Sequence, residues 1–385
     1  MIKLMSVVGT RPNFMKIAPI VEELKKYPHI EHRLVHSGQH YDQLLSDNFF
    51  HDLALPKPAV NLNAGSGSHA VQTAEIMKRI EPVLLEYKPH MLLVVGDVNS
   101  TLAAALTAVK LGFAVAHVEA GLRSFDLSMP EEINRKLTDS ISSLLFVTEQ
   151  SGVDNLVSEG IFTNKIFLVG NVMIDCLLRY REEAARSEIL ERLGVSNNGQ
   201  ACRPYGVLTL HRPSNVEDRS TLNGILTAVK NISHEFPVFF PIHPRTRKNL
   251  ETFGLLHYLS DSPREQNGII SLDPLGYLEF LSLNDHARIV MTDSGGVQEE
   301  TTVLGVPCLT LRENTERPAT VDHGTNQVVG VKPDRILAAA QDILRNVVLG
   351  DDVRPSRRPP LWDGKTAPRI VAILQDYLDR SSPQN

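Results

Sequence analysis

The chain has 385 residues, of which 42% are hydrophobic and 22% are charged, and its formal net charge is -6. One compact core rarely serves more than roughly 200 residues, so this length predicts two domains. The acidic balance excludes a broad basic surface for nucleic acid. The start MIKLMSVVG lacks a signal-peptide layout, and no apolar run approaches the roughly 18 residues of a membrane span, so we expect a cytoplasmic protein without membrane attachment.

The three cysteines, Cys176, Cys202 and Cys308, are scattered along the chain. Their spacing fits neither a disulfide framework nor a metal site. We therefore expect free thiols in a reducing compartment, and neither a metal nor a cofactor.

Short apolar runs with strand character alternate with helical patterns along the chain. The expected strands of the first half are Lys3–Val8, His32–His36, Met91–Val95, Ala114–Val118, Leu144–Val147 and Ile166–Val169. After a polar interruption at SNNGQACRP the rhythm restarts, and the expected strands are Gly206–Leu210, Val238–Pro241, Ile269–Leu272, Ala287–Thr292 and Val306–Thr310. This repetition predicts an α/β protein with two doubly wound, Rossmann-like domains.

The boundary between the domains is expected near Cys176, with an amino-terminal domain at 1–175 and a carboxy-terminal domain at 176–365. The remaining segment, 366–385, reads as a helix behind a Thr366 cap. Its apolar stripe consists of Ile370, Ile373, Leu374, Tyr377 and Leu378. Such a stripe must dock, and we expect the helix to pack back on the first domain.

Polar loops follow several of these strands and predict a ligand site, because open parallel sheets bind ligands beyond the carboxyl ends of their strands. After the first strand, Gly9-Thr10-Arg11-Pro12 opens a helix. Its backbone N–H groups, with Arg11 and Lys16, suit an anion. The alternative is an ordinary strand-to-helix turn with solvated charges.

Three carboxylates occupy neighbouring loops of the first half: Asp97, Glu119, and Glu131 next to Glu132. Strand alternation would place Glu119 on the same face as His117. Each acid alone is more simply explained as a helix cap or a first-turn acid. Three together favour a site in which carboxylates divide acid and base roles.

In the second half, His211-Arg212 ends the first expected strand, where His can serve a leaving phosphate oxygen and Arg can neutralise its charge. A structural histidine is the alternative. His243 ends the next strand and is expected to play a supporting part.

The segment Thr292-Asp293-Ser294-Gly295-Gly296 gives the strongest phosphate signal, because glycines let the backbone approach a ligand at a helix start. A plain helix entry is the alternative. One turn later, Glu299 or Glu300 can accept hydrogen bonds from ribose hydroxyls.

Two partial motifs are rejected. Gly65-Ser66-Gly67-Ser68-His69-Ala70 matches a dinucleotide-binding pattern but follows no hydrophobic strand. His117-x-Glu119 matches half of a zinc-deaminase signature, yet the chain contains no C-x-x-C to complete it.

Taken in order, GTRP with Lys16, GD at Asp97, HVEAGLR, PEEINR, GN at Asn171, HRPSNVED, TDSGGVQEE and TERP resemble the non-hydrolysing UDP-N-acetylglucosamine 2-epimerases over essentially the whole chain. The resemblance implies the GT-B architecture, in which two Rossmann-like domains face a central cleft. It also implies a UDP-N-acetylhexosamine substrate, a homodimer, and a supply of sugars for cell-surface polysaccharides. The implied reaction eliminates UDP to give 2-acetamidoglucal and then adds it back.

The resemblance assigns site residues by position. The positions that match the family's catalytic residues are Asp97, Glu119, Glu131 and His211. The positions that match nucleotide-sugar contacts are Arg11, Lys16, Phe280, Ser294, Gly295, Gly296, Glu300 and Arg317, and we add Arg212 and Leu275 as substrate-binding candidates.

Two departures accompany these assignments. Leu275 stands where the family often has Gln, so any contact with uracil would use its backbone. GQHYDQLL differs from a glutamine-rich allosteric segment found in several bacterial members. The open alternatives are a GT-B glycosyltransferase that uses a UDP-sugar, and a non-catalytic nucleotide-sugar sensor.

Overall fold

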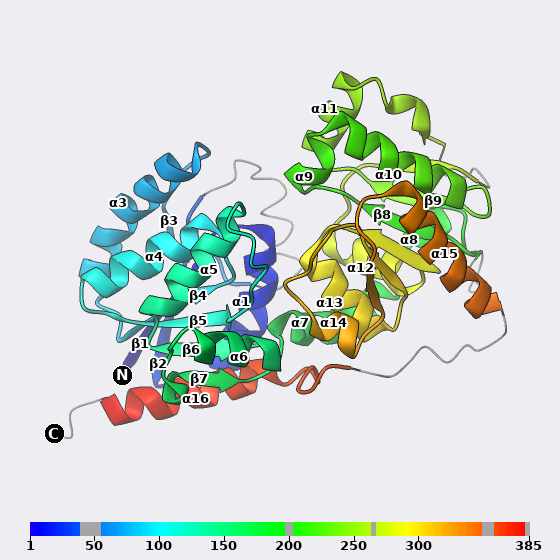
Figure 1. Cartoon of the computed structure of the whole chain (residues 1–385). Helices are drawn as coiled ribbons and strands as arrows, with labels where there is room; N and C mark the ends of the chain where they lie inside the picture. Colours follow the sequence, from blue (N-terminus) through cyan, green and yellow to red (C-terminus); the bar gives the residue numbers. More distant parts are fainter. Residues whose placement is uncertain (39–54, 197–202, 263–266, 349–357, 382–385) are drawn as a thin grey trace. The chain divides into compact units, whose positions relative to one another are not determined.

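The computed structural model describes residues 1–38, 55–196, 203–262, 267–348 and 358–381 (Figure 1). The chain divides into two compact units, with unit 1 comprising Met1–Cys176 and Pro360–Asn385, and unit 2 comprising Leu177–Pro359. Within the described ranges, each unit contains one seven-stranded sheet in which all paired strands run parallel. The predicted fold class, α/β with two doubly wound units, is confirmed.

The sheet of unit 1 has the strand order β3-β2-β1-β4-β5-β6-β7. Its strands are β1 Ile2–Val8, β2 Ile30–His36, β3 Val60–Asn61, β4 Met91–Val95, β5 Ala114–Ala120, β6 Leu144–Val147 and β7 Ile166–Leu168. The order reverses between β1 and β4, so the chain winds outward in both directions from this pair. In doubly wound sheets such a switch point leaves a crevice for a ligand.

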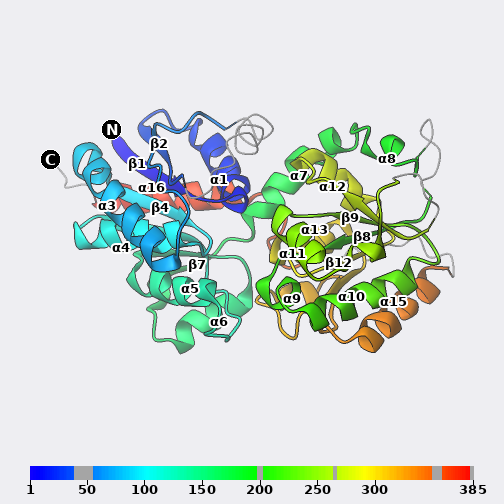
Figure 2. The ribbon, with the colours of Figure 1, turned by 90° about the horizontal axis from the view of Figure 1, so that it is seen from above.

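Helices cover both faces of this sheet. They are α1 Arg11–Leu24, α3 His69–Tyr87, α4 Asn99–Lys110, α5 Pro130–Ile141, α6 Gln150–Ser158, α16 Thr366–Ser381 and the 3-10 turn η1 Thr163–Lys165. Helices α3, α4 and α5 pack in a row, whereas α16 lies beside α1 (Figure 2). All five residues of β4 are buried, as expected for a central parallel strand covered on both faces.

The carboxy-terminal segment is anchored on unit 1 by specific contacts. The Nε1 of Trp362 donates to the Thr148 carbonyl at 3.0 Å, and the ring is buried. Asp175 accepts hydrogen bonds from the backbone N–H groups of Thr366 at 3.1 Å and Ala367 at 2.7 Å. The amino end of α16 is therefore capped by Asp175, and Thr366, the cap expected from the sequence, is instead the first residue of the helix.

The sheet of unit 2 has the order β10-β11-β9-β8-β12-β13-β14, so its switch point lies between β8 and β12. The strands are β8 Gly206–Thr209, β9 Val238–Pro241, β10 Leu259–Ser260, β11 Ile269–Leu272, β12 Ile289–Thr292, β13 Cys308–Thr310 and β14 Asn326–Val328. The helices are α8 Ile189–Arg192, α9 Pro213–Val216, α10 Arg219–Ile232, α11 Pro244–Thr252, α12 Tyr277–Asp285, α13 Gly295–Leu304, α14 Ala319–Asp322, α15 Pro333–Val348 and η2 Leu256–Tyr258. Helix α7 Val172–Ala184 begins in unit 1 and continues into unit 2.

An apolar core fills one face of this second sheet. Side chains of α10, α11 and α15 pack there against the strands, and α10 contacts α15 directly. Among the described residues, no helix is both long and apolar enough to cross a membrane.

Candidate active site

Four of the predicted site residues follow the strands at the switch points of the two sheets. In unit 1, Arg11 is the first residue of α1 after β1, and Asp97 follows the adjacent strand β4. In unit 2, His211 follows β8, and Ser294 follows the adjacent strand β12. Each unit by itself thus brings predicted polar residues to its own switch point.

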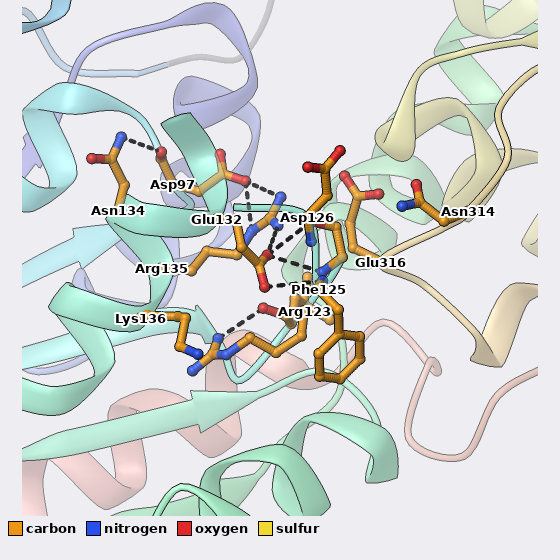
Figure 3. Close-up of polar contacts among 12 residues, drawn as sticks. Asp97, Arg123, Phe125, Asp126, Glu132, Asn134, Arg135, Lys136, Asn314 and Glu316 are labelled. Atoms are coloured by element: carbon orange, nitrogen blue, oxygen red, sulfur yellow. Dashed lines mark hydrogen bonds and ion pairs between the residues drawn. The ribbon is translucent and has the colours of Figure 1, made fainter. Parts of the chain in front are cut away.

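Asp97 is held by an arginine from α5 (Figure 3). Its Oδ2 accepts hydrogen bonds from Arg135 Nε at 3.0 Å and Nη2 at 2.6 Å. Asn134 Nδ2 donates to the Asp97 carbonyl at 2.9 Å. The side chain of Arg135 is 2% exposed and that of Asp97 is 23% exposed, so the arginine is buried behind a carboxylate that still reaches solvent.

Glu119 lies at a β-bulge, where the register between β5 and β6 shifts from Val118 to Ala120. Its φ of +73° is unusual for a residue with a side chain. Bulges re-aim side chains and occur often beside active sites. As a result, Glu119 pairs with Lys16 of α1, whereas His117 bonds to Asp139 of α5, and the simple alternation expected from the sequence does not apply here.

The loop of Asp97 and the pair of Glu119 with Lys16 meet at Gly96. A Cβ on Gly96 would lie 3.1 Å from Lys16 Nζ and 3.4 Å from Glu119 Oε2. Gly96 has a φ of +69°, which also favours glycine. The structure therefore brings Asp97, Glu119 and Lys16 together at one strand end.

A buried network of hydrogen bonds and ion pairs holds the loops that follow β4 and β5. His117 Nε2 contacts the Gly96 carbonyl at 2.8 Å, and His117 Nδ1 contacts Asp139 Oδ1 at 2.7 Å. Asp139 also accepts from the Gly121 N–H at 3.1 Å and pairs with Arg123 at 2.8 Å. Burial raises the pKa of Asp139, but His117 and Arg123 outweigh it and hold the pKa below its usual value.

Glu131 and Glu132 lie in the first turn of α5 and differ in their surroundings. Glu132 is buried, and it accepts from the N–H groups of Ser124 at 2.9 Å and Phe125 at 3.1 Å and from Arg135 Nη1 at 2.8 Å (Figure 3). It therefore organises the loop before α5. Glu131, the residue predicted to be catalytic, is half-buried.

His211 in unit 2 is held by Asp293, a residue that the sequence did not single out as part of the site. His211 Nδ1 lies 2.8 Å from Asp293 Oδ1. The carboxylate is fully buried, whereas 47% of the histidine side chain is exposed. Burial raises the pKa of Asp293, but His211 and the N–H groups around it hold the pKa below its usual value.

The predicted phosphate loop begins α13. Ser294 is its N-cap residue, and the Ser294 N–H donates to Thr292 Oγ1 at 3.0 Å. A Cβ on Gly295 would lie 3.0 Å from the guanidinium carbon of Arg317, so this arginine packs closely against the helix start. Gly296 follows in the first turn of the same helix.

Arginines and buried glutamates surround this loop. Arg317 Nε donates to Glu299 Oε1 at 2.7 Å. Glu316 accepts from Arg212 Nη2 at 3.2 Å and from Arg312 Nη1 at 2.5 Å. Guanidinium groups beside the backbone N–H groups of a helix amino terminus suit an anion.

Glu300 is buried within α13. Burial, with the neighbouring Glu299, raises the pKa of Glu300 to about 8. At neutral pH its carboxyl group is therefore mainly protonated in the folded chain and can donate as well as accept a hydrogen bond.

Three further residues named from the sequence, Leu275, Phe280 and His243, also belong to unit 2. Leu275 is half-buried in the loop between β11 and α12, and Phe280 is half-buried within α12. His243 caps α11, where its Nδ1 accepts from the Arg245 N–H at 3.3 Å.

Some expectations fall partly outside the described residues. They include Cys202 and residues 39–45 of the GQHYDQLL segment. Cys176 and Cys308 are buried, and neither forms a disulfide with another described residue. Among the described residues, no group of histidine, cysteine and carboxylate side chains is arranged to hold a metal ion.

Sequence reasoning missed three residues that hold predicted site residues, namely Arg135, Asp293 and Glu316. It also missed Asp139 and Arg312, which support the neighbouring loops. The segments PEEINR, TDSGG and TERP contain Arg135, Asp293 and Glu316, so their motifs were visible in the sequence. Their partners lie 38, 82 and 104 residues away, and no local pattern shows such pairs.

Comparison with known proteins identifies the family. A family model described as UDP-N-acetylglucosamine 2-epimerase matches residues 22–375. The chain belongs to this family. The resemblance read from the motifs is therefore confirmed.

Individual members of the epimerase family align over nearly the full chain. A Methanocaldococcus jannaschii protein named UDP-N-acetylglucosamine 2-epimerase is 43% identical over 374 residues, covering 97% of this chain and 98% of its own. A Pseudomonas aeruginosa protein named UDP-2,3-diacetamido-2,3-dideoxy-D-glucuronate 2-epimerase is 39% identical over 353 residues, covering 91% and 94%.

A solved structure of the same family also matches. The M. jannaschii UDP-GlcNAc 2-epimerase, crystallised in complex with UDP-GlcNAc and UDP, aligns with a TM-score of 0.87 at 43% identity. The alignment covers 97% of this chain and 100% of that structure.

Proposed function

We propose that this protein is a UDP-N-acetylglucosamine 2-epimerase, which interconverts UDP-N-acetylglucosamine and UDP-N-acetylmannosamine. Its membership of the epimerase family carries the proposal. The chemistry of the site residues agrees with it, because unit 1 presents carboxylates for the sugar and unit 2 presents a helix amino terminus with arginines for the diphosphate. A homodimer in the cytoplasm belongs to the same proposal.

The chemistry explains why both sets of groups are needed. The C2–H bond of the sugar is not acidic, because no carbonyl group adjoins it. We propose that the C1–O bond breaks, its electron pair leaves with UDP, and a base removes the C2 proton to give 2-acetamidoglucal. UDP then adds back to C1 while a proton is delivered to the opposite face of C2.

The residues of this chain divide these tasks in the proposal. Asp97 is held by Arg135 and Glu119 by Lys16, and in the proposal these two carboxylates stabilise the developing cation. Together with Glu131 they share proton transfer at C2. His211 and Arg212 would serve the departing diphosphate.

Solvent exchange at C2 tests the function. Incubation with UDP-N-acetylglucosamine in deuterated water, followed by NMR, should place deuterium at C2 and generate UDP-N-acetylmannosamine. Asp97→Asn is the matched control, which should bind UDP normally and lose the exchange by roughly a hundredfold or more. Binding of the substrate by the unmodified chain without any exchange would contradict the proposal and favour a transferase or a sensor.

A second substrate deserves the same assay, because the P. aeruginosa relative is named for UDP-2,3-diacetamido-2,3-dideoxy-D-glucuronate. Parallel reactions with both sugar nucleotides would compare kcat/KM directly. If exchange is faster with the 2,3-diacetamido sugar nucleotide, the proposed reaction would stand and this sugar nucleotide would become the proposed substrate.

A further inference from the structure

Asp293 and His211 come from adjacent strands of unit 2. Strands β8 and β12 are paired in parallel, with Thr209 opposite Thr292. Asp293 directly follows β12, and His211 follows β8 by two residues. Their contact is therefore set by the pairing of two central strands and does not depend on a long loop.

Asp293 is surrounded by hydrogen-bond donors. Its Oδ2 accepts from the backbone N–H groups of His211 and Arg212, each at 3.0 Å, and from Asn215 Nδ2 at 3.2 Å. The side chain is fully buried. A buried carboxyl group that faces only donors is held in its ionised form, in agreement with the lowered pKa of Asp293.

An ionised Asp293 decides where the proton of His211 lies. The carboxylate has no hydrogen to give, so the 2.8 Å contact between Oδ1 and Nδ1 requires the hydrogen to be on Nδ1. The other ring nitrogen, Nε2, then accepts a hydrogen bond when the ring is neutral and donates one when it is charged. Nearly half of the His211 side chain is exposed, so a ligand can reach the ring.

We propose that Asp293 is a positioning residue that holds His211 with its hydrogen on Nδ1 and presents Nε2 to the departing diphosphate. The inference rests on the proposed function for the identity of that ligand. The role follows from geometry: the buried Asp293 carboxylate orients the ring and fixes the position of its hydrogen, and it does not itself contact the substrate.

Asp293→Asn tests the proposal with an isosteric change. We expect the amide oxygen to take the Oδ2 position, because the N–H groups of His211, Arg212 and Asn215 all contact it. Of these three donors, only the His211 N–H also contacts Oδ1, at 3.1 Å. The amide NH2 then faces Nδ1, which must become an acceptor, so the ring hydrogen moves to Nε2. In a buried Asp–His pair of this kind, the wrong tautomer removes catalysis while leaving the geometry intact.

Nitrogen NMR of protein labelled with 15N-histidine reads the tautomer directly. A His211→Gln variant identifies the His211 signals among the 14 histidines. At alkaline pH the unmodified protein should carry the hydrogen on Nδ1, and Asp293→Asn should carry it on Nε2. In the epimerase assay, kcat of Asp293→Asn should fall roughly a hundredfold or more, with KM changed by less than about threefold.

Asn215→Ala is the matched control. It removes another hydrogen-bond partner of Asp293 but leaves the carboxylate and His211 in place. It should lower thermal stability, because Asn215 Nδ2 also donates to the Leu311 carbonyl at 2.9 Å, while the His211 tautomer stays unchanged.

Three results would overturn the proposal. They are a hydrogen on Nε2 in the unmodified protein, a flipped tautomer in Asp293→Asn with near-normal kcat, and lost activity in Asp293→Asn with an unchanged tautomer. If Asp293→Asn does not fold, the spectrum of the unmodified protein still shows which ring nitrogen of His211 carries the hydrogen, and a hydrogen on Nε2 would refute the proposal. Absence of epimerase activity together with the expected spectra would refute the proposed function and leave the positioning of His211 intact.

Discussion

Three of the residues predicted to be catalytic each form an ion pair or hydrogen bond with one charged side chain. Asp97 bonds to Arg135, Glu119 to Lys16, and His211 to Asp293. Removing one member of such a buried pair leaves the other uncompensated, which destabilises the fold as well as the site. Activity losses in these variants therefore need a parallel measurement of stability, and neutral isosteres are the more informative substitutions.

Glu300 gives a prediction in which stability and pH are linked. Its pKa is raised from the usual 4.5 to about 8 by burial and by Glu299. Between these two values the folded chain binds a proton that the unfolded chain does not. The protonated Glu300 therefore makes its full contribution to the free energy of unfolding below about pH 4.5. This contribution is lost as the pH rises to about 8.

Glu300→Gln should therefore stabilise the ligand-free protein at neutral pH, on the order of 1–3 kcal/mol, because Gln is neutral at every pH. Chemical denaturation at several pH values measures the effect, and the gain should disappear in mild acid. Glu251→Gln, an exposed change on α11, is the control and should alter stability little. A Glu300→Gln variant that is less stable at neutral pH would contradict the prediction.

At the scale of elements, local sequence patterns predicted the long central strands and most strand ends correctly. The short edge strands β3, β10 and β14 were missed, because their sequences VN, LS and NQV contain no apolar run. The bulge at Glu119 was also missed. It arises from the pairing of β5 with β6 and leaves no mark in the alternation of β5 alone.

Helix α16 provides the prediction at this scale. Asp175→Ala removes both hydrogen bonds to the amino end of α16 and should cost about 1 kcal/mol of local stability. Trp362 is the single tryptophan of the chain and is buried just before this helix, so its fluorescence reports the change. We expect a red-shifted emission and faster hydrogen exchange at residues 366–370.

The control for this experiment lies on the same helix. Asp376→Ala removes an exposed pair with Arg380 and should leave the Trp362 emission unchanged. Equal spectra for Asp175→Ala and the unmodified protein would show that Asp175 does not hold the segment in place.

At the scale of the whole molecule, the two units differ in how the chain builds them. Unit 2 is one continuous stretch, Leu177–Pro359, and its apolar core is drawn entirely from within that stretch. Unit 1 needs two separate stretches, since α16 packs on α1. A unit with its own continuous core is expected to fold alone.

A fragment of residues 177–359 should therefore unfold cooperatively in circular dichroism and bind UDP in calorimetry. It should not exchange the C2 proton, because Asp97, Glu119 and Glu131 belong to unit 1. The same fragment with Arg317→Ala is the control and should bind UDP more weakly. An unfolded fragment, or a folded one without affinity for UDP, would refute this division of roles.

The sequence by itself determined the fold class, the loops that follow the central strands and the family, because each depends on local periodicity or on short motifs. Only the tertiary structure decided which charges are paired. The partners of Glu119, Asp97 and His211 lie 103, 38 and 82 residues away. The cap of α16 comes from a residue 191 positions earlier in the chain. Such contacts depend on which strands and helices become neighbours in the folded chain. A local sequence pattern indicates whether a segment forms a helix or a strand, but it does not indicate which segments will pack beside it.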